Sequence, residues 1–222
     1  MSNEYVAIVP ARGGSKGLAL KNIRALAGKP LFQHAVDQGL RTVSRVVVST
    51  DMHEILGSDQ QDTVELYNRP AQFAQDTSTM DDVLRDVISA QNLTGKTLVL
   101  LQVTSPLRLD QDVLDAISVY ETGHYDLVQT VTPAELSILK WGMRQGTTFI
   151  PVSKPEYCFS NRQSLPEVFK PNGAVYVFGA DWFIANGGLA TDRIGLCEMP
   201  NERSQDIDTL ADFKAVEDLL KK

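Results

Sequence analysis

A glycine-rich, basic segment follows the first strand-like run of the sequence, "YVAIVPA". It consists of Arg12, Gly13, Gly14, Ser15, Lys16 and Gly17. Glycines let backbone N–H groups approach an anion closely, and arginine and lysine add positive charge. The pattern is neither the P-loop nor the Gly-x-Gly-x-x-Gly dinucleotide fingerprint. A triphosphate carries about four negative charges, so it suits Arg12, Lys16 and Lys21 better than a pyrophosphate diester does. A solvated basic turn is the alternative.

Polar residues also end two further strand-like runs. The run "TLVLLQV" contains Gln102 and leads into Thr104, Ser105 and Arg108, and "RVVVST" leads into Asp51. Ligands bind open α/β sheets beyond the carboxyl ends of the strands, so these polar residues are expected to contact and recognise a ligand. A helix-entry turn is the alternative for Ser105, and capping of the following helix is the alternative for Asp51.

A pair of carboxylates lies near the end of the chain, in "SQDIDT". Asp206 and Asp208 are two residues apart, so in an extended segment they share one face. Two such carboxylates repel each other unless a cation lies between them, and hard oxygen ligands suit Mg²⁺, especially when phosphate supplies more ligands. The alternative is that Asp208 only caps a helix that starts at Thr209.

The elements that would position these residues alternate between strand-like and helical patterns. Near-continuous apolar runs are typical of central strands covered on both faces, and amphipathic segments lie between them. The alternation predicts an α/β fold with a doubly wound, mostly parallel sheet. The strands are expected at 5–11, 45–50, 63–67, 97–103 and 173–179, and the helices at 31–40, 79–91, 110–121 and 208–222.

The alternation stops after about Thr132. Residues 133–170 mix prolines, aromatics and basic residues without a helical period, which predicts an excursion from the sheet with antiparallel strands. Trp141, Tyr157 and Phe159 would be exposed there unless something covers them, which suggests an interface, and two-fold dimers are the commonest closed assembly. The alternative is that the segment folds back on its own sheet. Residues 1–222 are otherwise expected to form one domain.

Composition narrows the classes of partner. The chain has 222 residues, is 43% hydrophobic and carries a formal net charge of -7, which argues against nucleic-acid and anionic-membrane partners. Cys158 and Cys197 form no metal-like pair and are interpreted as reduced thiols. No signal peptide and no apolar run of membrane-spanning length is recognised, so a cytoplasmic location is expected.

Several segments, taken in order, resemble the CMP-sialic acid synthetase (acylneuraminate cytidylyltransferase) family over nearly the whole chain. They are "ARGGSKGLALKN", "STD", "RPAQFAQDTS", "LLQVTSPLR", "FKPNGAVYV" and "SQDIDT". The related 3-deoxy-octulosonate cytidylyltransferases have a Tyr-Gly-Ser-Thr-Arg-like first loop instead. Ala19 and Val103 stand where the family often has proline, Met80 where some members have serine, and Lys170 where some have arginine.

The resemblance implies a Rossmann-like nucleotidyltransferase that joins CMP from CTP to a nine-carbon 2-keto sugar acid for surface glycans such as lipopolysaccharide or capsule, with release of pyrophosphate. Catalysis would be positioning and charge neutralisation, with Arg12, Lys16 and Asp208 as the central residues. The nucleotide would be bound by the loop residues Arg12 to Lys16 and by Lys21, Asn22, Arg69, Asp76, Ser78 and Thr79. The sugar acid would be bound by Gln102, Thr104, Ser105, Lys140, Arg162, Lys170 and Asn172.

The resemblance also implies that Asp206 and Asp208 hold Mg²⁺, and that the protein is a homodimer in which the arm at 133–170 reaches the neighbour's site. Two other functions stay open. A GT-A glycosyltransferase has a similar nucleotide domain and an Asp-x-Asp pair, although that pair lies near the middle of the chain. A non-catalytic nucleotide-binding module would leave the polar strand ends unused. The sugar itself, N-acetylneuraminate, legionaminate or pseudaminate, stays open as well.

Overall fold

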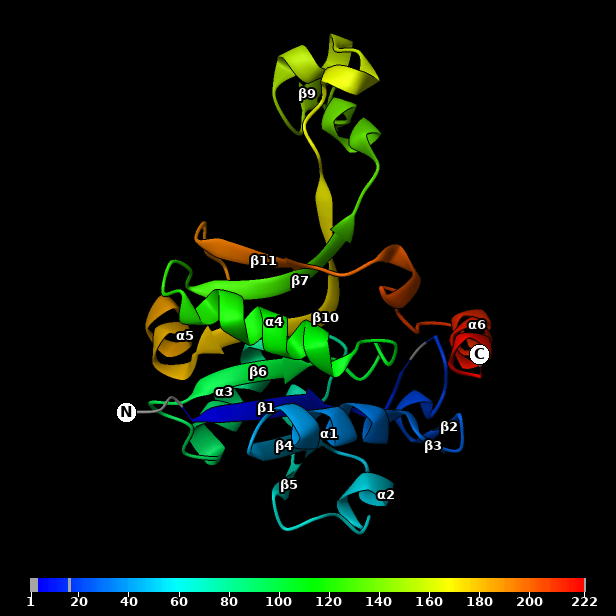
Figure 1. The fold of residues 1–222 in the computed structure, drawn as a ribbon, viewed down its shortest axis with the longest axis vertical. Coiled ribbons are helices and arrows are strands. Elements are labelled where there is room, and N and C mark those ends of the chain that lie inside the picture. Colours follow the sequence, from blue (N-terminus) through cyan, green and yellow to red (C-terminus); the bar gives the residue numbers. More distant parts are fainter. Residues whose placement is uncertain (1–3, 16, 222) are drawn as a thin grey trace.

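The computed structural model describes residues 4–15 and 17–221, so the predicted phosphate ligand Lys16 lies outside the described residues. Within these residues the main sheet has seven strands in the order β11-β7-β10-β6-β1-β4-β5 (Figure 1). The strands are β1 (Tyr5–Pro10), β4 (Arg45–Thr50), β5 (Val64–Asn68), β6 (Thr97–Leu101), β7 (Leu127–Pro133), β10 (Phe169–Gly179) and β11 (Ile194–Glu198).

Helices cover both faces of this sheet. They are α1 (Leu31–Thr42), α2 (His53–Leu56), α3 (Met80–Ala90), α4 (Asp110–Glu121), α5 (Ala180–Asn186) and α6 (Leu210–Leu220). In β1, Ala7 and Val9 pack in the core that holds α1, α4 and α6, whereas Val6 and Ile8 pack in the core of α3 and α5. This burial on both faces explains the near-continuous apolar run. No helix within residues 4–15 and 17–221 is long and apolar enough to cross a membrane.

The predicted fold class is confirmed. Neighbouring strands of the sheet are parallel except at β10, which runs antiparallel to both β6 and β7. The carboxyl ends of β1, β4 and β6 therefore lie at one edge of the sheet, which is where the polar residues of the sequence motifs follow. The predicted helices at 31–40, 79–91 and 110–121 correspond to α1, α3 and α4.

The sequence interpretation missed two strands of the main sheet, β7 and β11, and the helix α5. In β7 the polar Thr130 and Thr132 interrupt the apolar run, yet both are buried because their hydroxyls donate to Asn172 Oδ1 at 2.7 Å and Asn201 Oδ1 at 2.8 Å. These partners are remote in sequence. β11 is an edge strand whose residues alternate between exposed and buried, so it lacks the continuous apolar character of the central strands.

Between β7 and β10 the chain leaves the sheet and forms a projecting arm, which we define as residues 134–168 (Figure 1). The arm carries a small antiparallel sheet of β8 (Gly142–Gln145) and β9 (Thr148–Pro151), as the sequence predicted. The alternative, in which this segment folds back on its own sheet, is wrong. The two ends of the predicted excursion, Pro133 and Lys170, belong to β7 and β10.

The arm exposes apolar side chains at high density. Phe159 is 92% exposed, and Trp141, Met143 and Phe149 are each exposed by more than half (58%, 60% and 58%). Tyr157 is only partly exposed. Contiguous exposed apolar side chains of this kind mark surfaces that bind another protein.

Candidate nucleotide and metal site

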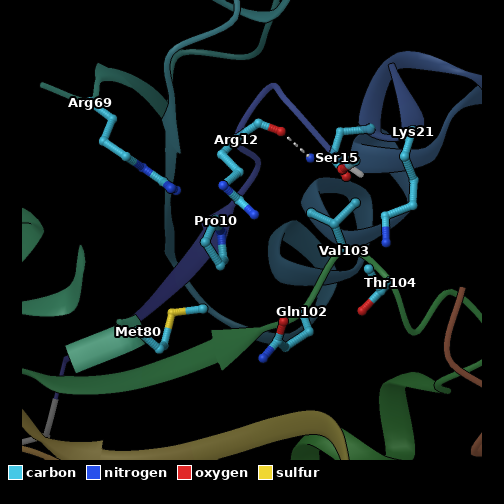
Figure 2. Close-up of a pocket in the computed structure, with 10 residues that line it drawn as sticks. Pro10, Arg12, Ser15, Lys21, Arg69, Met80, Gln102, Val103 and Thr104 are labelled. Atoms are coloured by element: carbon cyan, nitrogen blue, oxygen red, sulfur yellow. Dashed lines mark hydrogen bonds between the residues drawn. The ribbon is translucent and has the colours of Figure 1, made fainter. Parts of the chain in front are cut away.

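An open pocket of about 190 Å³ lies at the carboxyl ends of β1 and β6 (Figure 2). It is lined by Pro10, Arg12, Ser15, Lys21, Asn22, Arg69, Met80, Gln102, Val103 and Thr104. Most of these residues are candidates that the sequence motifs supplied. The fold therefore brings the basic loop, the start of "RPAQFAQDTS" and the end of "LLQV" to one place, although they lie tens of residues apart in the chain.

The first half of the basic loop is held by hydrogen bonds within the protein. The Ala11 amide donates to Ser49 O at 2.9 Å, and the Arg12 carbonyl accepts from Asn22 Nδ2 at 2.8 Å (Figure 2). The Gly13 amide donates to Asp51 Oδ1 at 2.7 Å. Gly14 then adopts φ +67°, a conformation that favours glycine. The loop backbone is thus fixed up to Gly13, and the amides of Gly14 and Ser15 have no hydrogen-bond partner in the described part of the chain.

The helix-cap interpretation of Asp51 is wrong. Helix α2 begins after Met52 without a side-chain cap, and the Met52 amide donates to Thr50 Oγ1 at 3.0 Å. The Asp51 carboxylate instead accepts the Gly13 amide across two neighbouring strands. The local sequence favours the helix start as the partner of Asp51, because α2 follows β4 directly whereas Gly13 follows β1, a strand remote in sequence.

Arg12 points into the pocket and is paired there (Figure 2). Its Nη2 lies 3.0 Å from Asp76 Oδ1, and its Nη1 donates to the Ala74 carbonyl at 3.4 Å. These contacts bring residues 74–76 of "RPAQFAQDTS" against the basic loop. An incoming phosphate would meet a guanidinium that already has one carboxylate neighbour.

Lys21 joins the basic loop to the acidic segment before α6. Its ammonium donates to the Ile207 carbonyl at 2.5 Å and lies 3.3 Å from Asp208 Oδ1, and the residue is only 8% exposed. Gly17 approaches the same segment so closely that an added Cβ would lie 2.3 Å from the Asp208 carbonyl oxygen. The first loop and the last acidic segment therefore form one structural unit.

Asp206 and Asp208 flank the fully buried Ile207, so their carboxylates point away from the core. Thr104, which lines the pocket, hydrogen-bonds Asp206, and the Thr104 carbonyl accepts the Ile207 amide at 3.0 Å. The pKa of Asp206 is raised because its surroundings desolvate the carboxylate and because Asp208 lies nearby. Repulsion of this kind is what a cation between the two carboxylates would relieve.

The cap interpretation of Asp208 is also wrong. Thr209 caps α6, since its hydroxyl accepts the Asp212 amide while the Asp212 carboxylate accepts the Thr209 amide. The side chain of Asp208 is 75% exposed. Within the part of the chain that the structure describes, no group of three or more His, Cys, Asp or Glu residues could hold a metal ion.

Arg69 is a buried cation at the pocket wall. It is 4% exposed and is held by neutral groups, because its Nε donates to Ser49 Oγ at 3.0 Å and its Nη2 to Ser49 O at 2.8 Å. Burial lowers its pKa to about 10. Ser78 and Thr79, its predicted companions, do not line the pocket: Ser78 Oγ donates to Gln72 O, and Thr79 caps α3.

Gln102 lines the pocket and is positioned by Arg108. The buried Arg108 donates to the carbonyls of Gln102 at 3.0 Å and Ala174 at 2.7 Å, and burial lowers its pKa to about 9. Ser105 lies outside the lining, with its hydroxyl buried and without a partner in the described residues. Asn172 is also outside the lining, and it bonds Thr130 and Ser204.

The remaining substrate candidates lie on the arm or its base. Lys140 donates to Ser160 O at 2.6 Å within the arm, and the guanidinium of Arg162 has no hydrogen-bond or ion-pair partner in the described part of the chain. Lys170 is exposed in β10. Because the arm projects from the sheet, the structure does not bring Lys140 and Arg162 to the pocket of their own chain (Figure 1).

Sequence reasoning missed two contributions to the site. Asp51 holds the loop through Gly13, and Arg108 holds the backbone at Gln102. The available signal was a charged residue after an apolar strand: Asp51 follows β4 directly, and Arg108 lies seven residues beyond the end of β6. Because the partners of these two residues are remote in sequence, the pattern placed both residues near the site but did not show which backbone group each one holds.

The chain was compared with known families and proteins. Residues 6–154 match the family described as Cytidylyltransferase. An N-acylneuraminate cytidylyltransferase of Streptococcus agalactiae serotype III (strain NEM316) is 30% identical, over 94% of this chain and 51% of its own length. The chain thus spans about half the length of that relative. A CMP-N,N'-diacetyllegionaminic acid synthase of Campylobacter jejuni is 29% identical, over 98% of this chain and 95% of its own length.

The fold is shared with a solved structure. A CMP:2-keto-3-deoxy-manno-octonic acid synthetase complexed with CTP superimposes with a TM-score of 0.71 at 18% sequence identity, over 99% of both chains. At this identity the likeness concerns the fold alone.

The close approach of Gly17 to the acidic segment gives a stability prediction. Gly17→Ala should lower the free energy of unfolding by about 1–3 kcal/mol, because the new methyl group overlaps the Asp208 carbonyl. Gly13→Ala is the matched control, since its Cβ would meet no atom closer than 3.5 Å and its φ needs no glycine. Denaturant unfolding measures both variants. Equal stability of the two alanine variants would contradict the packing of the loop against Asp208.

Proposed function

Because the chain belongs to the cytidylyltransferase family, we propose that it transfers CMP from CTP to the anomeric hydroxyl of a nine-carbon, sialic-type 2-keto sugar acid. The hydroxyl oxygen attacks the α-phosphorus, the bond from the α-phosphorus to the bridging oxygen breaks, pyrophosphate leaves and the hydroxyl proton is released. The names of the relatives support this class of acceptor. The observation that carries the proposal is one pocket lined by the basic loop, Arg69 and Gln102, next to the aspartate pair.

The basic loop is proposed to bind the triphosphate. Arg12 and Lys21 supply charge from two sides of the pocket, and the amides that follow Gly13 supply hydrogen bonds. Lys16 is proposed to join them. Arg69, which has no carboxylate partner among the described residues, is proposed to bind the base or ribose. Catalysis then consists of positioning and of neutralising charge that develops on the leaving pyrophosphate.

Asp206 and Asp208 are proposed to hold Mg²⁺. The donor set fits, because hard carboxylate oxygens suit this ion and triphosphate oxygens would complete its coordination. Both aspartates contact pocket residues, Asp206 through Thr104 and Asp208 through Lys21. When bound, Mg²⁺ would neutralise negative charge on the phosphates.

The sugar acid is proposed to be bound by residues from two copies of the chain. Gln102 and Thr104 face the pocket from β6 and its following turn, with Ser105, Asn172 and Lys170 supporting that side. Lys140 and Arg162 would come from the arm of a second copy in a homodimer, because the exposed apolar arm surface needs a partner. Two free cysteines agree with a cytoplasmic enzyme that supplies CMP-sugars for surface glycans.

The reaction predicts stoichiometric products. With CTP and Mg²⁺, one pyrophosphate should form per CMP-sugar when N-acetylneuraminate, legionaminate or pseudaminate is supplied, and their relative kcat/KM identifies the preferred acid. Asp208→Asn should lower the unfolding midpoint only slightly, because Asn keeps an oxygen for the Lys21 ammonium and Thr209 rather than Asp208 caps α6, yet lose most turnover. CTP binding without turnover on any of these acids would contradict the proposal, and so would cleavage of a nucleotide sugar.

The shared site predicts complementation between two inactive variants. Asp208→Ala removes a metal ligand from the body, and Arg162→Ala removes a cation from the arm. After subunit exchange about half of the dimers would be mixed, each with one intact site, so about a quarter of wild-type activity should return. Native mass spectrometry verifies the exchange. Exchange without recovered activity would mean that each site is built within one chain.

A further inference from the structure

The segment at the carboxyl end of β4 has no role in the reaction proposed above, although it makes several contacts with the basic loop. Thr50 Oγ1 donates to the Ala11 carbonyl at 2.6 Å, and the Ser49 carbonyl accepts the Ala11 amide at 2.9 Å. Asp51 adds the bond from the Gly13 amide at 2.7 Å. Three consecutive residues at the end of β4, Ser49, Thr50 and Asp51, therefore hold Ala11 and Gly13, the two neighbours of Arg12.

The carboxylate of Asp51 is committed to the loop. Helix α2 has no side-chain cap, and the Met52 amide at its start is bonded to Thr50. Within the described residues Asp51 forms no ion pair with a cation. Burial lowers the pKa of Arg69, and the nearby carboxylate of Asp51 partly opposes this effect by raising it. In the part of the chain that the structure describes, the one hydrogen bond of Asp51 is that from the Gly13 amide, at 2.7 Å.

The bond between Asp51 and the Gly13 amide limits which amides of the loop can bind an anion. The Gly13 amide is already bonded to a carboxylate, so a phosphate cannot use it unless it displaces Asp51. Immediately after Gly13 the chain turns at Gly14, with φ +67°. The bond to Asp51 fixes the position of the Gly13 amide. It therefore sets where the turn at Gly14 starts and in which direction the side chain of Arg12 extends from the backbone.

Asp51 also balances charge at the pocket wall. Arg12 and Arg69 both line the pocket, and Arg12 lowers the pKa of Arg69 through repulsion, whereas Asp51 raises it. The negative charge of Asp51 thus offsets the repulsion between two cations that the site needs close together. Removing the side chain would loosen the loop and also take away this charge, whereas Asp51→Asn takes away the charge alone.

We propose that Asp51 is a positioning residue for nucleotide binding: its hydrogen bond to the Gly13 amide fixes the basic loop so that Arg12 is held in the pocket before CTP arrives. This inference rests on the proposed cytidylyltransferase function. Asp51 itself contacts no reacting atom and acts through the loop.

Two substitutions separate the hydrogen bond from the charge. Asp51→Ala removes both, and we expect it to raise the KM for CTP about tenfold and to lower kcat/KM about a hundredfold, since misplaced binding groups cost that much. Asp51→Asn keeps an oxygen that can accept the Gly13 amide, so it should stay within about fivefold of wild type. Asp62→Ala, an exposed aspartate between α2 and β5, is the control and should leave both constants unchanged.

A second measurement does not depend on turnover. Amide hydrogen exchange of residues 11–15 in the ligand-free protein should be faster in Asp51→Ala than in Asp51→Asn or Asp62→Ala, because the bonded Gly13 amide is released. Isothermal titration with CTP on the same samples reports binding directly. If wild type makes no pyrophosphate with any sugar acid, the proposed function fails, while the exchange and titration data still decide the role of Asp51.

The outcomes are distinct. Slow turnover and fast loop exchange in Asp51→Ala, with both restored by Asp51→Asn, support the positioning role. An Asp51→Ala variant that matches Asp62→Ala in CTP binding and loop exchange would overturn it. Equal impairment of Asp51→Asn and Asp51→Ala would overturn it too, since charge rather than the hydrogen bond would then be responsible.

Discussion

The site depends on the buried ammonium of Lys21. An ammonium group removed from water is strongly destabilising unless it is paired and hydrogen-bonded, and Lys21 obtains both partners from a segment 186 and 187 residues away, the Ile207 carbonyl and Asp208. That segment in turn is attached to the central strand through the Thr104 carbonyl and the Ile207 amide. One cation therefore ties the first loop, the end of β6 and the approach to α6 together.

The cations at this edge of the sheet, Lys21 included, fall into two groups. Arg12 and Lys21 are paired with the carboxylates of Asp76 and Asp208, which keeps these flexible side chains near the pocket. Arg69 and Arg108 are buried and held by hydroxyl and carbonyl oxygens, and burial lowers the pKa of each. Arg12 and Lys21 can release their carboxylate partners and bind a phosphate in their place. The buried ones are rigid, which suits them to orient a ligand or a neighbouring residue such as Gln102.

The elements that the sequence predicted are those whose pattern is local. Apolar runs buried on both faces identified β1, β4 and β6, and amphipathic periodicity with a capping threonine identified α3. β7 was missed because its buried threonines are satisfied by Asn172 and Asn201, which no local pattern reveals. Asp51 and Asp208 were open to a capping interpretation for the same reason: their partners, the Gly13 amide and Lys21, are brought to them only by the tertiary fold. The motifs indicated which residues gather at the strand ends, and the fold determines which of them touch.

The central claim is that the first basic loop and the last acidic segment form a single site for a metal-bound triphosphate. A crystal structure of the protein with CTP and Mn²⁺, which replaces Mg²⁺ and scatters anomalously, tests it most directly. The account predicts an anomalous peak within bonding distance of Asp206 or Asp208, with triphosphate oxygens on the same ion and Arg12 and Lys21 against the phosphates. A triphosphate bound away from the loop, or a peak that neither aspartate touches, would contradict it.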